Sequence, residues 1–162
     1  MIEEHINRFE QSFRHVNDRD WDAYRDTISA ALLYRAPGIG GIMTGREPNV
    51  AALRSMVMAF PDGRAEVERS FGSDDWACFQ ATFTGTHTGP LRTSNEVVLP
   101  SGKPTRHRYC LVVRFGLSGE AVEIDEYHDR LDLLAQLGAG VGSRPSQHTE
   151  PESAERSRGP TV

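Results

Sequence analysis

The sequence predicts an α+β fold, in which a curved antiparallel sheet wraps around N-terminal helices. Up to residue 60, apolar residues recur every three or four positions, which is typical of amphipathic helices. From residue 65 to residue 129 they alternate with polar residues, which is typical of half-buried strands. Helices followed by a run of strands indicate the α+β class, and 162 residues with 38% hydrophobic residues are ordinary for one globular domain.

Three helices are expected in the first 60 residues. In the first, apolar residues from Ile2 to Val16 follow spacings of three and four, and the polar pair after Val16 ends the helix. Asp20 is expected to cap a second helix, whose inner face extends to Ile28. The other elements expected here are a strand at 32–36, a loop at 38–45 and a third helix at 50–60, which stops before a proline.

The second half of the chain is expected to supply most of the sheet. Ser118-Gly119 is a turn signal between the last two strands. The connection 89–104 is long and rich in proline and glycine, so we expect a mobile flap there. Such a sheet, curved over the helices, would leave a pocket between them. The expected strands are 65–71, 76–83, 105–115 and 121–129, and a helical turn at 131–137 follows.

Composition argues against several classes of protein. Eighteen basic residues against 23 acidic residues give a net charge of −5, which argues against a nucleic-acid binder. No apolar run approaches the ~18 residues of a membrane span, and the N-terminus lacks a signal-peptide pattern, so we expect a cytoplasmic protein. Cys78 and Cys110 have no CxxC partner, so neither a disulfide scaffold nor a cysteine zinc site is expected.

The chain is expected to form one domain over residues 1–138, followed by a tail. From Ala139 onward, glycine, serine, proline, glutamate and arginine dominate. Too few apolar side chains remain there to offset the entropy lost on ordering the chain. We therefore expect residues 139–162 to be disordered.

The segment 123–129 carries most of the acidic groups of the last strand. Strand alternation places Glu123, Asp125, Tyr127 and Asp129 on one face, and it places Glu126 on the other face with its apolar neighbours. If the first face is exposed, it is a solvated acidic edge, which the spacing alone favours. If it points into a pocket, one of its carboxylates has a raised pKa and is a general base for a carbon acid.

The six histidines do not cluster at metal-ligand spacing, so no metal site is expected. His87 follows a strand in a turn, where a histidine most often bonds local backbone groups. His107 and His128 lie on expected strands, where structural histidines are commoner than catalytic ones. A catalytic role for any of them therefore needs further support.

Five short motifs, in order, resemble those of the SnoaL-like polyketide cyclase family, within the nuclear transport factor 2 superfamily. Together they span about residues 5–138. Each is weak alone, and their order and spacing make the resemblance specific. They are Asn17-Asp18-Arg19-Asp20-Trp21, Ala59-Phe60-Pro61-Asp62, Thr84-Gly85-Thr86-His87-Thr88-Gly89, Ser101-Gly102-Lys103-Pro104, and the run from Asp129-Arg130-Leu131 to Gln136-Leu137-Gly138.

The resemblance implies a cone-shaped, cystatin-like α+β barrel with an apolar pocket and no metal or organic cofactor. It implies a cyclase or isomerase of secondary metabolism, such as antibiotic biosynthesis, acting on a hydrophobic, polyketide-like substrate by an intramolecular aldol closure. In this reading Asp129 is the general base, and His107 assists. The residues expected to bind substrate are Tyr34, Phe60, Phe79, Phe83, His87, Tyr109, Asp125 and Tyr127.

Two other readings stay open at this point. An epoxide hydrolase or cyclase of the same fold would use Arg106, Arg108 or Arg114 to orient Asp125 or Asp129 around a water. A non-enzymatic module would hold a small apolar ligand in the same pocket. The environment of Asp129 discriminates between them, because a buried carboxylate favours an enzyme. The family also suggests a homodimer, which we expect to pair through the outer sheet face around Trp76.

Overall fold

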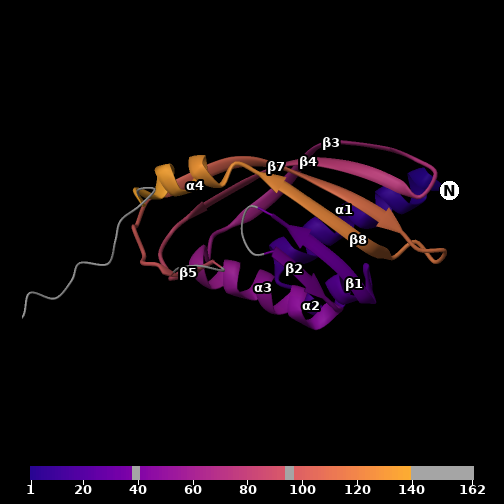
Figure 1. Ribbon diagram of the computed structural model, residues 1–162, viewed down its shortest axis with the longest axis horizontal. Helices are drawn as coiled ribbons and strands as arrows, with labels where there is room; N and C mark the ends of the chain where they lie inside the picture. The colour runs from indigo at the N-terminus through magenta and orange to yellow at the C-terminus, as the bar shows by residue number, and fades with distance from the viewer. Residues whose placement is uncertain (38–40, 94–96, 140–162) are drawn as a thin grey trace, which may run out of the picture.

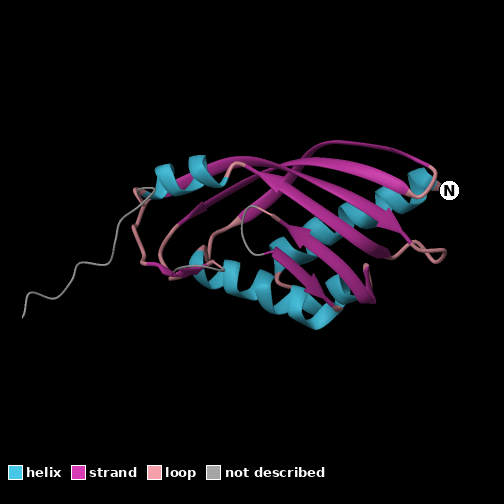
Figure 2. Ribbon diagram, in the orientation of Figure 1, coloured by secondary structure: helices cyan, strands magenta, loops and turns pink. Residues whose placement is uncertain are grey.

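The computed structural model describes residues 1–37, 41–93 and 97–139, and it has the α+β fold that the sequence predicts (Figures 1 and 2). None of the helices in these ranges combines the length and the apolarity needed to cross a membrane. The elements are α1 (Ile2–Asp18), α2 (Trp21–Arg25), β1 (Ile28–Ala36), β2 (Gly41–Thr44), α3 (Arg46–Ala59), β3 (Arg64–Ser73), β4 (Trp76–Thr86), β5 (Leu91–Arg92), β6 (Val97–Val98), β7 (Pro104–Phe115), β8 (Ala121–His128) and α4 (Arg130–Leu137).

The N-terminal helices form as expected, with one correction. Helix α1 ends at Arg19, which adopts the left-handed conformation (φ 63°). Helix α2 begins at Asp20, whose side chain accepts a hydrogen bond from the backbone N–H of Ala23 at 3.0 Å. Ile28 was expected on the inner face of α2, but it opens strand β1 instead. Its β-branched side chain is fully buried there, opposite Ala121 of β8.

Six strands form one sheet in the order β2-β1-β8-β7-β4-β3. All neighbouring pairs are antiparallel except β1 and β8, which run parallel. The sheet curves around α1, with α3 closing the open side (Figure 1). Strand β2 lies within the expected loop 38–45, and residues 38–40 lie outside the described ranges. Because β2 is a four-residue edge strand, its alternation is too short to be read from the sequence.

The connection after β4 passes close to the end of α3. The backbone N–H groups of Thr88 and Gly89 donate to the carbonyl of Ala59 at 3.0 and 3.1 Å. A Cβ on Gly89 would lie 2.0 Å from the carbonyl oxygen of Met58, so only glycine allows this approach. Two short strands, β5 and β6, pair antiparallel within the expected flap 89–104. Residues 94–96 of this segment lie outside the described ranges.

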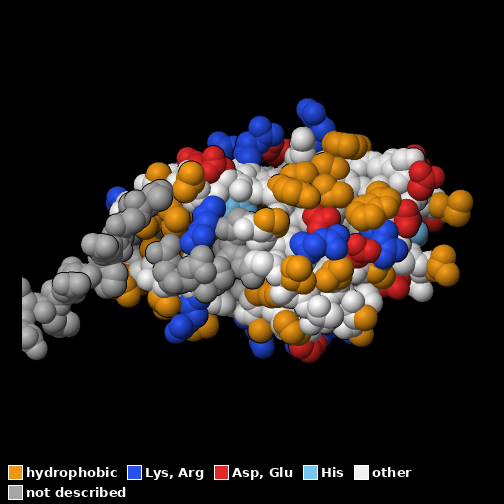
Figure 3. Space-filling view, in the orientation of Figure 1, with side chains coloured by type: hydrophobic (Ala, Val, Ile, Leu, Met, Phe, Trp, Pro, Cys, Tyr) orange, Lys and Arg blue, Asp and Glu red, His pale blue; other side chains and the backbone are white. Residues whose placement is uncertain are grey.

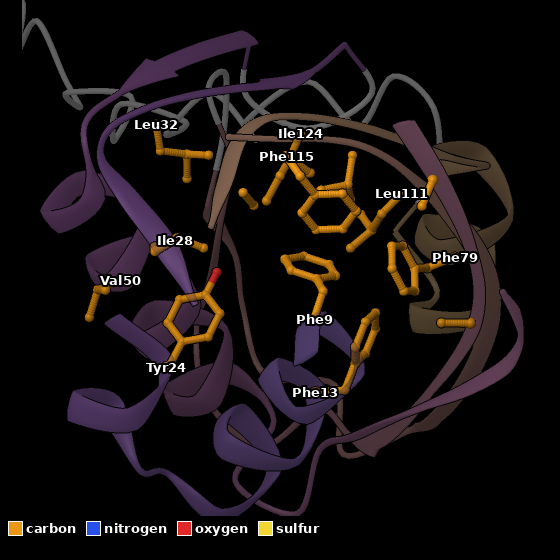
Figure 4. Close-up of a cluster of buried hydrophobic side chains, with 14 residues drawn as sticks. Phe9, Phe13, Tyr24, Ile28, Leu32, Val50, Phe79, Leu111, Phe115 and Ile124 are labelled. Carbon is orange, nitrogen blue, oxygen red and sulfur yellow. The ribbon is translucent and has the colours of Figure 1, made fainter. Parts of the chain in front are cut away.

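Two clusters of apolar side chains form the core of the barrel. The larger lies on the concave face of the sheet, where Phe9 and Phe13 of α1 pack against Phe79 of β4 (Figure 4). The smaller joins the end of α3 to α4 through Phe60, Leu133 and others. Between these clusters the barrel is not filled, and the pocket described below lies there. Its walls draw residues from both clusters or from their immediate neighbours: Tyr34, Leu53, Ala65, Tyr109, Phe60, Leu91 and Leu133.

The last strand is shorter than expected. Strand β8 ends at His128, and Asp129 is the N-cap of α4 rather than a strand residue. Helix α4 ends at Gly138 in the left-handed conformation (φ 76°). The tail expected from residue 139 lies, except for Ala139, outside the described residues.

Candidate functional site

An apolar pocket of about 440 Å³ lies between the concave face of the sheet and helices α3 and α4. Its volume falls in the range typical of small-molecule sites. Aliphatic and aromatic side chains make most of its wall, with a few polar groups among them. The apolar wall includes Met43, Leu53, Met56, Val57, Phe60, Phe83, Leu91, Leu133 and Leu134.

Among the described residues that line this pocket, Glu126 is the one carboxylate. The hydroxyl of Tyr34 donates a hydrogen bond to its Oε2. Nδ1 of His128 lies 3.0 Å from Oε1, a close contact without hydrogen-bond geometry. His128 itself is fully buried behind Glu126. The carboxylate thus accepts a hydrogen bond from Tyr34 on one oxygen and contacts His128 with the other.

Three tyrosines, one buried and two half-buried, lie near this carboxylate. The pKa values of Tyr24, Tyr34 and Tyr109 are all raised above the usual 10, first by burial and next by the negative charge of Glu126. All three phenols therefore stay protonated near neutral pH, and the hydroxyl of Tyr34 already donates to Glu126. Tyr24 uses its hydroxyl to donate to Oδ1 of Asn49 at 2.7 Å.

His107 lines the pocket and lies two residues before Tyr109 in β7, on the same face of the strand. Its ring centroid lies 5.4 Å from that of Phe83 and 6.1 Å from that of His128. Burial lowers the pKa of His107, and the neighbouring His128 lowers it further. The imidazole is therefore neutral near pH 7, and it can donate one hydrogen bond into the pocket.

The structure brings together some of the residues expected at the site. Tyr34, Phe60, Phe83, His107 and Tyr109 line the pocket. The other residues expected to bind substrate lie elsewhere: Phe79 is fully buried in the larger core cluster, His87 is buried outside the pocket wall with Nδ1 3.2 Å from Ser101 Oγ, and Asp125 and Tyr127 are on the outer face of β8.

Asp129 does not lie in the pocket, which corrects the position expected for it. Its side chain is exposed, which by the criterion set out above does not support an enzyme that uses Asp129, and its Oδ1 accepts a hydrogen bond from the backbone N–H of Asp132 at 3.0 Å. The carboxylate therefore caps α4. The physical reason is that the chain turns from strand to helix at this residue, which points the side chain along the helix start rather than into the barrel.

The acidic face of β8 points outward, as the spacing favours, but it is not a solvated edge: β8 is an inner strand, and the Glu123 and Asp125 side chains are 20% and 17% exposed beside arginines. Nη2 of Arg35 lies 2.9 Å from Glu123 and 3.1 Å from Asp125, and Nε of Arg114 lies 2.7 Å from Glu123. Arg114 and then Arg35 lower the pKa of Glu123. An arginine-oriented water at Asp125, as in the epoxide reading, would thus lie on the outer face and not in the pocket.

Sequence reasoning missed several residues of the site. Glu126 and Asn49 line the pocket, as do the three arginines Arg19, Arg92 and Arg130. One signal for Glu126 was available, because strand alternation places it on the apolar face of its strand. The arginines follow or begin elements, where no periodicity indicates which way a side chain points.

Solved structures share this fold. AclR from Streptomyces galilaeus, a candidate hydroxylase, aligns with a TM-score of 0.71 and 21% identity over 85% of this chain and 98% of that one. IdmH from Streptomyces antibioticus, a candidate polyketide cyclase, gives a TM-score of 0.66 and 22% identity over 84% and 97%. A candidate SnoaL-like polyketide cyclase from Jannaschia sp. CCS1 gives 0.71 and 21% over 85% and 91%.

At these identities the structural likeness shows the fold alone. A comparison with curated proteins finds no match. The family model for SnoaL-like polyketide cyclases, however, matches residues 4–137, which is most of the chain. The matched range covers every helix and strand from α1 to α4 except the first two residues of α1. The chain therefore belongs to the SnoaL-like polyketide cyclase family.

Proposed function

We propose that the protein is a cofactor-independent cyclase or isomerase that acts on a hydrophobic, carbonyl-rich, polyketide-like substrate, with Glu126 as its general base. The observation that carries this proposal is a carboxylate in an apolar pocket wall, hydrogen-bonded by Tyr34 and in contact with His128. Membership of the family supports the reaction class. The position of Glu126 in the pocket wall is what favours it over Asp129, which caps α4.

The first step is removal of a proton from the carbon next to a substrate carbonyl. Glu126 accepts this proton, and negative charge develops on the carbonyl oxygen. A neutral donor close by stabilises that charge, because an apolar surrounding strengthens its hydrogen bond. Tyr109 and His107 are the candidates, since both line the pocket and both are uncharged near neutral pH.

In an aldol closure the enolate carbon then attacks a second carbonyl of the same molecule. A carbon–carbon bond forms, and the proton held by Glu126 is transferred to the new alkoxide, which restores the carboxylate. In an isomerisation the same proton returns to a different carbon. Both outcomes need one base that accepts and returns a proton, and neither needs a metal or a redox group.

Hydrogen–deuterium exchange tests this step without the natural substrate. The full-length protein is incubated in D₂O with a bicyclic aromatic ketone such as 2-tetralone, and loss of the α-proton signal is followed by NMR. E126Q keeps size and shape and leaves an acceptor for the Tyr34 hydroxyl. We expect it to lower the protein-catalysed exchange rate by ~10²–10⁴, the usual contribution of a positioned acid–base group.

D129N is the matched control, because asparagine caps a helix about as well as aspartate. It removes the other candidate carboxylate and should exchange at the wild-type rate. Loss of exchange in D129N with E126Q unaffected would return the role to Asp129. Tight binding of the ketone by the wild type with no exchange above the solvent rate would instead indicate a non-enzymatic binding module.

A further inference from the structure

The pocket wall has the opposite charge balance to the whole chain. The chain carries a net charge of −5. The described residues that line the pocket include the guanidinium groups of Arg19, Arg92 and Arg130 against the single carboxylate of Glu126. A cavity wall with more guanidinium groups than carboxylates attracts anions through its net positive charge.

Arg19 is fixed in the wall by backbone groups. It follows α1 in the left-handed conformation, and its guanidinium donates to the carbonyl oxygens of Val16, Pro61 and Gly63 at 2.9, 2.9 and 3.0 Å. Within the described ranges, no carboxylate lies within 4.0 Å of it. Carbonyl acceptors hold the side chain in position but leave its full positive charge uncompensated.

Arg92 and Arg130 border the same end of the barrel. Arg92 follows the buried Leu91 in β5, and Arg130 is the first residue of α4; both elements lie at the end opposite the N-terminus of the chain (Figure 1). Leu91, which precedes Arg92, and Leu133, three residues after Arg130, also line the pocket and are apolar. The wall thus combines cationic groups with an apolar surface, which matches an amphipathic ligand.

We propose that the pocket takes an amphipathic anion, an apolar and carbonyl-bearing body with a carboxylate that is bound by Arg19 and Arg92. The guanidinium of Arg92 offers paired N–H donors that match a carboxylate, and Arg19 adds a fixed positive charge. Glu126 repels the anionic group, so the ligand binds with its uncharged part toward Glu126. This inference rests on the proposed function for the identity of the pocket, and it adds the substrate class and its orientation.

Calorimetric titration of the full-length protein with simple probes tests it. The probes are dodecanoate, methyl dodecanoate, dodecyl phosphate and dodecyltrimethylammonium, each below its micelle concentration. We expect dodecanoate to bind at least tenfold more tightly than its methyl ester, and the ammonium probe to bind most weakly. The preference should shrink as salt increases, because salt screens charges near solvent. Tighter binding of the phosphate would also support an anion site, with phosphate as the preferred group.

Two variants locate the site. R92M removes a charge from an exposed side chain, and R19M removes the fixed one. Each should weaken dodecanoate about tenfold and leave the ester unchanged. R106M, on the exposed outer face of β7, is the control and should change neither. Because R19M also loses three hydrogen bonds, R92M keeps the test valid if R19M does not fold.

Equal affinity for dodecanoate and its ester, or equal losses for both probes in R92M, would overturn the proposal. The result is independent of the exchange assay. Anion preference with no effect of E126Q on exchange would contradict the proposed base and keep the anion site. Loss of exchange in E126Q with no anion preference would support Glu126 as the base and contradict the anion site.

Discussion

Two thiols lie side by side on the outer face of the sheet. Sγ of Cys78 on β4 and Sγ of Cys110 on β7 are 3.2 Å apart, on neighbouring strands. Both side chains are half-buried. Burial, and then the neighbouring Cys78 thiol, raise the pKa of Cys110 to about 11. The pair is therefore close enough to react, while the thiolate form of Cys110 is scarce at neutral pH.

We predict that diamide joins Cys78 and Cys110 in one disulfide within the chain. The two thiols lose two electrons and two protons, and diamide is reduced to its hydrazine form.

Alkylation of Cys110 should accelerate about tenfold per pH unit from pH 8 to 10, since its thiolate fraction still rises where an ordinary thiol, with a pKa of about 8.5, levels off. Mass spectrometry of intact protein and of peptides measures both.

C78S is the control for the disulfide, because it leaves Cys110 without its neighbour. It should form no intrachain disulfide with diamide. Disulfides found only between two chains would contradict the observed proximity. A rate of Cys110 alkylation that stops rising near pH 8.5 would contradict the raised pKa.

At the scale of residues, alternation correctly predicted which residues of the last strand share a face. It did not determine which of the two faces meets the pocket. It separated Glu126 from Glu123 and Asp125, and the structure keeps that separation. It could not indicate which face meets the pocket, because that depends on the direction in which the whole sheet curves. Asp129 was placed by motif position, and its true direction depends on the helix cap that follows it.

At the scale of elements, the contribution of the α4 N-cap to stability can be measured. Helix α4 has eight residues, too few to be stable alone, and it buries Leu133, Leu134 and Leu137 against the barrel. The Asp129 carboxylate accepts from the N–H of Asp132 at its first turn. Loss of this cap should loosen a helix whose leucines also line the pocket.

We predict that D129A lowers the free energy of unfolding by about 0.5–2 kcal/mol, the usual contribution of such a cap. D129N should cost less than half as much, because asparagine can accept the same hydrogen bond. Urea denaturation followed by circular dichroism measures both variants. If D129N were as destabilising as D129A, the negative charge rather than the hydrogen bond would be the stabilising feature.

Elements with long periodic patterns were predictable, and those set by distant partners were not. Helix α1 and strands β4 and β7 agree with their patterns to within a few residues. Strand β1 begins at Ile28 because that residue pairs with Ala121 of β8, 93 positions later in the chain. The parallel direction of this pair follows from the barrel topology, which no local pattern encodes. Helix α3 starts four residues before the first residue of its apolar repeat, Val50.

At the scale of the whole molecule, the convex face of the sheet exposes several large apolar side chains. Its apolar side chains include Phe71, Trp76 and Tyr127, which are 54%, 38% and 56% exposed. On the same face, toward β1, lies the charged group formed by Arg35, Glu123 and their partners, whose charges are paired within the chain. Figure 3 shows hydrophobic side chains flanking such a cluster of acidic and basic ones. An apolar face with internally paired charges is suited to a protein interface.

We predict that the protein is a homodimer that pairs through this face. Light scattering at high micromolar concentration should give twice the 18.0 kDa of one chain. The double variant F71R/W76R adds two like charges per chain to the β3–β4 part of the face, so it should dissociate the dimer while circular dichroism stays unchanged. L117R adds a charge at the fully exposed turn between β7 and β8, beyond the end of the paired strands, and should stay dimeric. A wild-type mass near 18 kDa would exclude the dimer, and dissociation by L117R as well would place the interface elsewhere.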